Sequence, residues 1–191
     1  MQTETIPYTL EVLERLRLNA HLVKRSHFQA SNRRSHYHVL CGLPIIIFNL
    51  ILGSVFFTQV TTLLPQWCQW LGAFLALTAA LLGGMQTFFN FESRSEGHRE
   101  MGNQYLAIAR ECERLIALFF DQQLPLAQLS KKLEQLNERY ANINQQAEAF
   151  AVHDKDYRCA LLDQRAKLKR EPSQLMRRKK ELSTTDTSIT L

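Results

Sequence analysis

The residue types that could carry chemistry in this 191-residue chain are scattered along it. Its four cysteines lack the paired spacing of a zinc site (Cys41, Cys68, Cys112 and Cys159). The closest histidine pair is His36 and His38, which on a helix point about 200° apart and are poorly placed to share a metal ion. The sequence has no glycine-rich phosphate loop and no nucleophile elbow. We therefore expect no enzyme activity, no metal and no cofactor.

Three side-chain amides stand out by their surroundings, those of Asn49, Gln86 and Asn90. They lie in a run from Val39 to Phe91 that contains no Asp, Glu, Lys or Arg. Polar groups in such a run usually face a neighbouring helix or a water-filled path. Two roles are open for Asn49, lining a pore or bonding to the second helix of its own hairpin. Gln86 and Asn90 are candidates for the same polar role within the membrane.

The uncharged run predicts a membrane hairpin. About 20 helical residues cross the apolar part of a bilayer, so residues 39–91 suffice for two spans and a turn. We expect the spans at about 39–58 and 69–90, joined by a connector over 59–66. The mean hydropathy of the whole chain is only −0.21 because the remainder is strongly polar. The predicted fold is therefore an all-α membrane protein, and a hairpin buried in a soluble core is the disfavoured alternative.

The flanking charges predict the orientation of the hairpin. Basic residues occur on both outer sides of the spans, whereas the connector has none (Lys24, Arg25, Arg33, Arg34, Arg94, Arg99 and Arg110). Loops rich in Lys and Arg remain in the cytoplasm. We therefore expect both termini in the cytoplasm.

Outside the spans the apolar residues repeat with helical periods. We expect an amphipathic helix over 1–38, a helix over 92–121, a heptad helix over 125–170 and a basic, disordered tail over 171–191. The heptad positions predict a coiled-coil or bundle interface (Leu126, Leu129, Leu133, Leu136, Tyr140 and Ile143). The basic tail has three open interpretations: contact with anionic lipid, contact with nucleic acid, or a solvated end.

Small residues predict that the hairpin associates with other helices. Gly72, Ala76, Ala80 and Gly84 recur every four residues on one face of the second span, and Gly53 shares a face with Asn49 in the first. Such ridges allow helix backbones to approach closely in a bilayer. Two spans cannot enclose a channel, so conduction would require a homo-oligomer.

The hairpin also carries an ordered series of small, aromatic and polar positions. The series comprises Arg33-Arg34, Gly42-Leu43-Pro44, Gly53-Ser54, Trp70, Leu82-Gly83-Gly84-Met85-Gln86, His98-Arg99 and Tyr105. Over roughly residues 8–120 it resembles the SLATT proteins, bacterial two-transmembrane effectors of antiphage conflict systems. In this resemblance the heptad segment and the basic tail lie outside the shared region.

The resemblance implies a membrane pore or disruptor that depolarises the cell and stops phage spread by abortive infection. It also implies a partner that triggers the effector: a nucleotidyltransferase, a SLOG sensor, or a reverse transcriptase of a retron. The alternative function is a non-conducting, membrane-anchored coiled-coil scaffold that recruits a soluble partner. The amide of Asn49 and that of Gln86 favour the pore, whereas the heptads suit either function.

Overall fold

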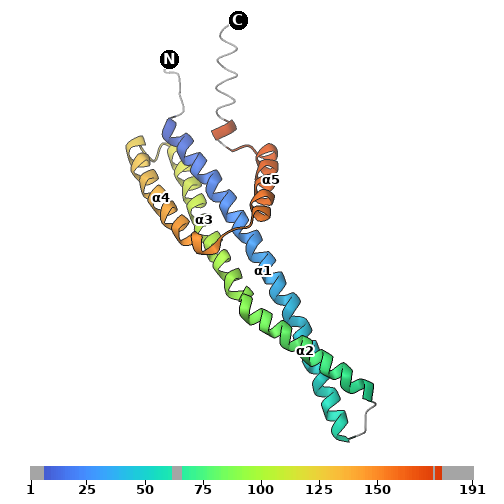
Figure 1. Cartoon of the computed structure of the whole chain (residues 1–191). Helices are drawn as coiled ribbons and strands as arrows, with labels where there is room; N and C mark the ends of the chain where they lie inside the picture. The colour runs from blue at the N-terminus through green and yellow to red at the C-terminus, as the bar shows by residue number, and fades with distance from the viewer. Residues whose placement is uncertain (1–6, 62–65, 174, 178–191) are drawn as a thin grey trace, which may run out of the picture. The chain divides into compact units, whose positions relative to one another are not determined.

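The computed structural model describes residues 7–61, 66–173 and 175–177, with the backbone alone for 55–61 and 66. Within these ranges all regular structure is helical, which confirms the predicted all-α fold. The elements follow one another along the chain (Figure 1) as α1 (Tyr8–Thr61), α2 (Gln66–Phe89), α3 (Phe91–Phe120), α4 (Leu126–Ala147), the short 3-10 helix η1 (Glu148–Phe150) and α5 (Asp154–Arg170).

These helices form two compact units. The bundle unit comprises Met1–Ala30 and His98–Leu191, and the hairpin unit comprises Ser31–Gly97. Helices α1 and α3 each contribute residues to both units. The two units differ in how far their apolar side chains are buried.

Helix α1 runs without interruption from Tyr8 to Thr61. The sequence predicted two successive helices here, over 1–38 and about 39–58, and from Tyr8 onward the described residues of both belong to this one helix. Pro44 lies inside it, where its ring nitrogen cannot donate to the carbonyl of Leu40. Membrane helices tolerate such a proline when neighbouring groups satisfy the freed carbonyl.

The core of the bundle unit consists mainly of apolar side chains from α1, α3 and α4. The repeated apolar positions of these segments supply its buried residues, which include Leu13, Leu16, Ala20, Met101, Tyr105, Ile108, Cys112, Leu115, Leu129, Leu136 and Ile143. Each helix thus buries one stripe against the others. The approach of α3 to α1 is close at Gly102, where a Cβ would lie 2.7 Å from the ring of Phe28.

The heptad segment forms two α-helices, whereas one was expected over 125–170. Helix α4 ends at Ala147, and the backbone is extended at His153 before α5 begins. Asp154 and Asp156 lie in the first turn of α5. Carboxylates there stabilise the positive end of the helix dipole, so the local sequence favours a new helix start. The heptad register therefore does not continue from α4 into α5.

Helix α5 packs on α1 within the bundle unit. The side-chain nitrogen Nε2 of Gln164 donates to the backbone carbonyl of Leu18 at 2.9 Å. The predicted disordered tail over 171–191 is described as far as Arg177, and in this part Leu175 is buried in the bundle core. The rest of that predicted tail lies outside the described residues.

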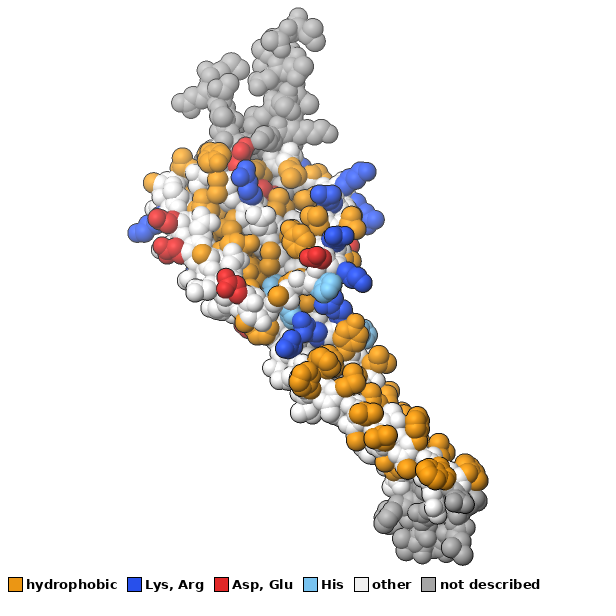
Figure 2. Space-filling view, in the orientation of Figure 1, with side chains coloured by type: hydrophobic (Ala, Val, Ile, Leu, Met, Phe, Trp, Pro, Cys, Tyr) orange, Lys and Arg blue, Asp and Glu red, His pale blue; other side chains and the backbone are white. Residues whose placement is uncertain are grey.

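The hairpin unit shows the opposite distribution of apolar side chains. Among the described residues of α2, only Ala79 is buried. Large apolar side chains are exposed along the unit, for example Leu50 (74%), Trp70 (73%) and Phe88 (81%). Figure 2 shows hydrophobic side chains along its visible face. An apolar surface of this extent is typical of a region that contacts a membrane or a protein partner.

Candidate functional site: the membrane hairpin

Two segments of the structure are long and apolar enough to cross a membrane. They belong to Tyr8–Ser54 and Trp67–Phe120, and their apolar 18-residue windows have mean hydropathies of 1.8 and 1.5. None of the first window and 6% of the second is buried. A core helix of a soluble protein would be mostly buried, so this exposure supports a membrane location for the hairpin.

The small-residue ridge of α2 lies mostly outside the packing of the hairpin. Ala76, Ala80 and Gly84 are exposed, and a Cβ at Gly84 would meet nothing within 4 Å. Gly72 differs, because a Cβ there would lie 3.8 Å from the side chain of Leu52. Within the described residues, most of the ridge is therefore open to contact with another helix.

Asn49 is exposed on α1. Within the described part of the chain its amide makes no hydrogen bond. Gly53, one turn further along, is also exposed, and a Cβ there would meet no described residue within 4 Å. Of the two roles open to Asn49, the bond to the second helix of its own hairpin is therefore not observed. In a bilayer an amide without a partner is costly.

Gln86 has a partner inside the hairpin unit. Its Nε2 donates to Nδ1 of His38 across the two helices at 3.2 Å. The same amide fills the space beside Gly42, where a Cβ would lie 3.4 Å from the Gln86 nitrogen. A side chain at position 42 would crowd this contact. Gln86 thus joins the helices as a polar bond, a role in which amides commonly occur in membrane proteins.

Asn90 is the single residue between α2 and α3, and its φ is 44°. This left-handed conformation is strained for most residues but accessible to Asn. Its N–H donates to the Gln86 carbonyl at 3.1 Å, and its carbonyl accepts from the N–H of Arg94 at 3.2 Å. Backbone hydrogen bonding therefore continues across the junction. This conformational role was not part of the sequence interpretation, which considered only the side chain of Asn90.

The predicted heptad interface lies largely inside the bundle unit. Its residues comprise the buried Leu129, Leu136 and Ile143, the partly buried Leu133 and Tyr140, and Leu126, which is 44% exposed. The buried and partly buried residues pack in or against the core shared with α1 and α3. The heptad pattern of α4 is thus explained by packing within one chain.

A buried histidine pair in the bundle unit escaped the sequence analysis. The Nδ1 atoms of His27 and His98 are 3.1 Å apart, and these residues are only 2% and 1% exposed. Tyr105 stacks on His27 at 5.6 Å and donates its hydroxyl to Asn144 at 2.7 Å. Burial lowers the pKa of His27 to about 4. The position of His27 in the apolar repeat was the available signal, but nothing in its spacing identifies His98 as its partner.

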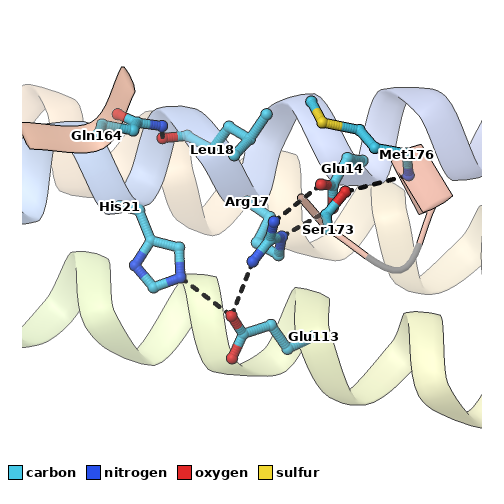
Figure 3. Close-up of polar contacts among 8 residues, drawn as sticks. All are labelled: Glu14, Arg17, Leu18, His21, Glu113, Gln164, Ser173 and Met176. Atoms are coloured by element: carbon cyan, nitrogen blue, oxygen red, sulfur yellow. Dashed lines mark hydrogen bonds and ion pairs between the residues drawn. The ribbon is translucent and has the colours of Figure 1, made fainter. Parts of the chain in front are cut away.

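The sequence analysis also missed a polar network between α1 and α3. Arg17 donates to Glu113 at 2.9 Å and to both carboxylate oxygens of Glu14 at 2.7 and 2.8 Å. His21 contacts the same Glu113 oxygen at 3.1 Å (Figure 3). Although burial acts in the opposite direction, the hydrogen bonds from His21 and Arg17 hold the pKa of Glu113 below its ordinary value. The network joins the polar edges of two helices whose apolar faces form the core.

Metal-ligating side chains are dispersed in the structure as they are in the sequence. The described residues contain no group of three or more His, Cys, Asp or Glu side chains that could hold a metal ion. All four cysteines are free thiols. Burial raises the pKa of Cys112 to about 12, which keeps this thiol protonated and unreactive at neutral pH.

The sequence model of the SMODS and SLOG-associating 2TM effector domain family 4 (SLATT_4) matches residues 21–171. No curated protein and no solved structure matches the chain significantly. The match includes α4 and α5, so the expectation that the heptad segment lies outside the family region was wrong. Because residues 21–171 are most of the 191-residue chain, the protein belongs to this SLATT family of two-transmembrane effector domains.

Proposed function

We propose that this two-transmembrane effector of antiphage systems oligomerises in the bacterial inner membrane and, when triggered, permeabilises it and causes abortive infection. The observation that carries the proposal is the exposed amide of Asn49, which has no hydrogen bond within the described residues of its chain. Lipid tails cannot satisfy an amide. Its partner must then come from a neighbouring copy or from water in a pore.

The small-residue ridge supports the oligomeric part of the proposal. Ala76, Ala80 and Gly84 are exposed on α2, so close backbone contact through them requires a second molecule. Membrane helices commonly associate through small residues at such positions. Several copies are necessary for conduction, because one hairpin supplies only two spans.

The alternative function, a non-conducting scaffold, has less support. It requires the heptad residues of α4 to bind a soluble partner. Leu129, Leu136 and Ile143 instead pack in the core of their own chain. A partner could reach them only if α4 separated from the bundle, which would expose that core to water.

The proposal includes an orientation and a class of partner. We place both termini in the cytoplasm because the basic residues flank the spans and the connector has none. Reporter fusions at the C-terminus and within 59–66 should then give cytoplasmic and periplasmic signals. SLATT domains are associated with SMODS and SLOG partner domains in defence systems. We propose a nucleotidyltransferase, a SLOG sensor or a retron reverse transcriptase as the trigger.

The substitution Asn49→Leu tests the pore. The variant keeps a similar side-chain volume and inserts at least as well, but it removes the polar group from the span. Overexpression or triggering of the unmutated protein should collapse the membrane potential, and the Asn49→Leu variant should leave the potential intact. A potential-sensitive dye measures the difference in cells with equal amounts of membrane-inserted protein.

Thr78→Val is the matched control for this experiment. Thr78 is also polar and lies within a span, but its hydroxyl donates to the Phe74 carbonyl of its own helix at 2.8 Å. Its removal should leave depolarisation unchanged. Depolarisation by Asn49→Leu at the unmutated level would exclude Asn49 from the pore. Absence of depolarisation by the triggered, unmutated protein would exclude the pore itself.

Gly84→Ile tests the assembly separately. A Cβ at Gly84 would meet nothing within 4 Å among the described residues, so a bulky side chain there should mainly disturb contacts between copies. Crosslinking in native membranes should show loss of higher oligomers while insertion continues. Ala79→Ile is the contrasting variant, because Ala79 is buried and its enlargement should disturb the hairpin itself. Unchanged oligomers in Gly84→Ile would mean that another surface holds the assembly.

A further inference from the structure

A cavity of about 400 Å³ lies in the bundle unit, away from the residues assigned to the membrane function. Its walls come from α1, α3, α5 and the segment that follows α5. The volume is within the range of about 300–1,000 Å³ that small-molecule sites occupy. Three parts of the chain thus border a space that can hold a ligand: α1, α3, and α5 with the segment that follows it.

The walls of the cavity are held in place by hydrogen bonds. Glu113 on α3 accepts from Arg17 at 2.9 Å and contacts His21 at 3.1 Å, which fixes α3 to α1. Gln164 on α5 donates to the Leu18 carbonyl at 2.9 Å, which fixes α5 to α1 (Figure 3). The cavity is therefore built on structured elements, and the carboxylate of Glu113 is already engaged.

The cavity is strongly basic. Five permanent cations line it, Arg17, Lys24, Arg25, Lys167 and Arg177, against the carboxylates of Glu113 and Glu171. Among the described residues, Lys24, Arg25 and Lys167 have no ion-pair partner. Burial lowers the pKa of Lys24, and the positive charges of Arg25 and Lys167 lower it further. The cations therefore repel one another, and a multiply charged anion would relieve that repulsion.

A second feature restricts the chemistry of the ligand. Gln164 lines the cavity, and its Oε1 is buried without a hydrogen-bond partner in the described structure. An unsatisfied buried acceptor costs about 1–3 kcal/mol. A ligand with a hydroxyl or amino donor recovers that cost when the Gln164 side chain turns its Oε1 into the cavity. A sulfate ion would satisfy the lysines and arginines but, being fully deprotonated at neutral pH, would bring no such donor.

We propose that this cavity binds a phosphate ester that also carries hydroxyl or amino donors, with Lys24, Arg25 and Lys167 on the phosphate oxygens and Gln164 on a donor of the ligand. Phosphate groups bring negative charge and several acceptor oxygens, which suits clustered Lys and Arg side chains. A nucleotide, a sugar phosphate and the headgroup of phosphatidylglycerol share this chemistry. The proposal does not depend on pore formation, because binding is measured on the protein alone.

The double variant Lys24→Gln/Lys167→Gln tests the site in the purified full-length protein. Calorimetric titration with ATP, as a soluble phosphate ester, should show binding that weakens at least about tenfold in this variant, since each removed cation loses a charge-assisted contact. The matched control is Lys131→Gln/Lys132→Gln, which removes the same charge from exposed positions of α4. It should bind within about twofold of the unmutated protein, because screening weakens distant surface charges. Unfolding temperatures should show that both variants are folded.

Two further titrations define the ligand. Inorganic tripolyphosphate has as many phosphate groups as ATP but no sugar or base donors, so it should bind more weakly than ATP. Nanodiscs of phosphatidylcholine with and without phosphatidylglycerol test the lipid source in the same variants. If phosphatidylglycerol protects the protein thermally in a Lys24- and Lys167-dependent manner and ATP does not bind, the phosphate comes from the membrane. Equal loss of binding in both double variants, or binding of none of these probes, would overturn the proposal.

Discussion

The bundle unit buries most of its large apolar side chains, whereas the hairpin unit exposes most of its own. In the bundle unit Leu136 is 3% exposed, whereas in the hairpin unit Leu77 is 62% exposed and the amide of Gln86 is half-buried against His38. Water drives apolar side chains inward. Lipid supplies no such drive, and helices in it are held by close packing and polar bonds. The same residue type therefore has different roles in the two units: leucine is a core residue at position 136 and a surface residue at position 77.

The largest effect should follow from placing a charge in the bundle core. Leu136→Asp removes apolar contacts and buries a carboxylate, so it should cost at least about 4 kcal/mol of unfolding free energy. Hydrogen exchange of α4 in the full-length protein measures the loss. Leu162→Asp on α5 is the control, because Leu162 is 65% exposed and belongs to the same unit. Similar protection of α4 in both variants would contradict the assigned core.

A leucine-to-aspartate substitution on the hairpin surface tests whether that surface faces water or lipid. Leu77 is as exposed as Leu162, yet Leu77→Asp should oppose membrane insertion by about 3–4 kcal/mol. The fraction that resists alkaline extraction from membranes measures insertion, and Leu162→Asp should leave that fraction unchanged. Full insertion of Leu77→Asp would show that this surface does not face lipid.

The buried histidine pair predicts a pH dependence that belongs to the bundle unit. The pKa of His27 falls from 6.5 to about 4 on burial, so the unfolded chain binds more protons between these values. The stability contribution is complete above about pH 6.5 and is lost as the pH falls toward 4, by at most about 3 kcal/mol. Unfolding temperatures measured from pH 7 to pH 4 should decline in the unmutated protein.

The control for this prediction compares two histidines. His27→Gln should flatten the decline, because the group that gains a proton on unfolding is gone. His36→Gln alters an exposed histidine of the hairpin unit and should leave the decline unchanged. Identical pH profiles for the unmutated protein and His27→Gln would assign the dependence to other groups.

The smallest effect concerns the junction of α2 and α3. Asn90→Val places a β-branched residue at a φ of 44° and should destabilise the junction by about 1–2 kcal/mol, whereas Asn90→Gly should be tolerated. Protection of the adjacent amides from hydrogen exchange in detergent measures the effect. Equal loss in both variants would assign the role of Asn90 to its amide, as the pore interpretation supposes, and not to its backbone.

Local sequence patterns predicted part of the candidate site. The uncharged run over 39–91 indicated the two apolar helical segments, and the apolar repeats indicated which faces of α1, α3 and α4 are buried. The division of 125–170 into α4 and α5 was not predicted, because the seam continues through Tyr157 and Leu161 while the helix start depends on Asp154 and Asp156. Hydrophobic period and helix boundary are separate signals, and an unbroken apolar period does not show where one helix ends and the next begins.

The sequence by itself determined the all-helical class, the presence of an apolar hairpin and the ridge of small residues, because hydropathy and periodicity are properties of neighbouring positions. Only the tertiary structure decided which groups meet across the chain. It paired His27 with His98 and Gln86 with His38, left Asn49 without a hydrogen bond among the described residues, and gathered Lys24 and Lys167 around one cavity. The physical reason is that these contacts join positions far apart in the chain, and their geometry is fixed by helix packing that no local spacing encodes.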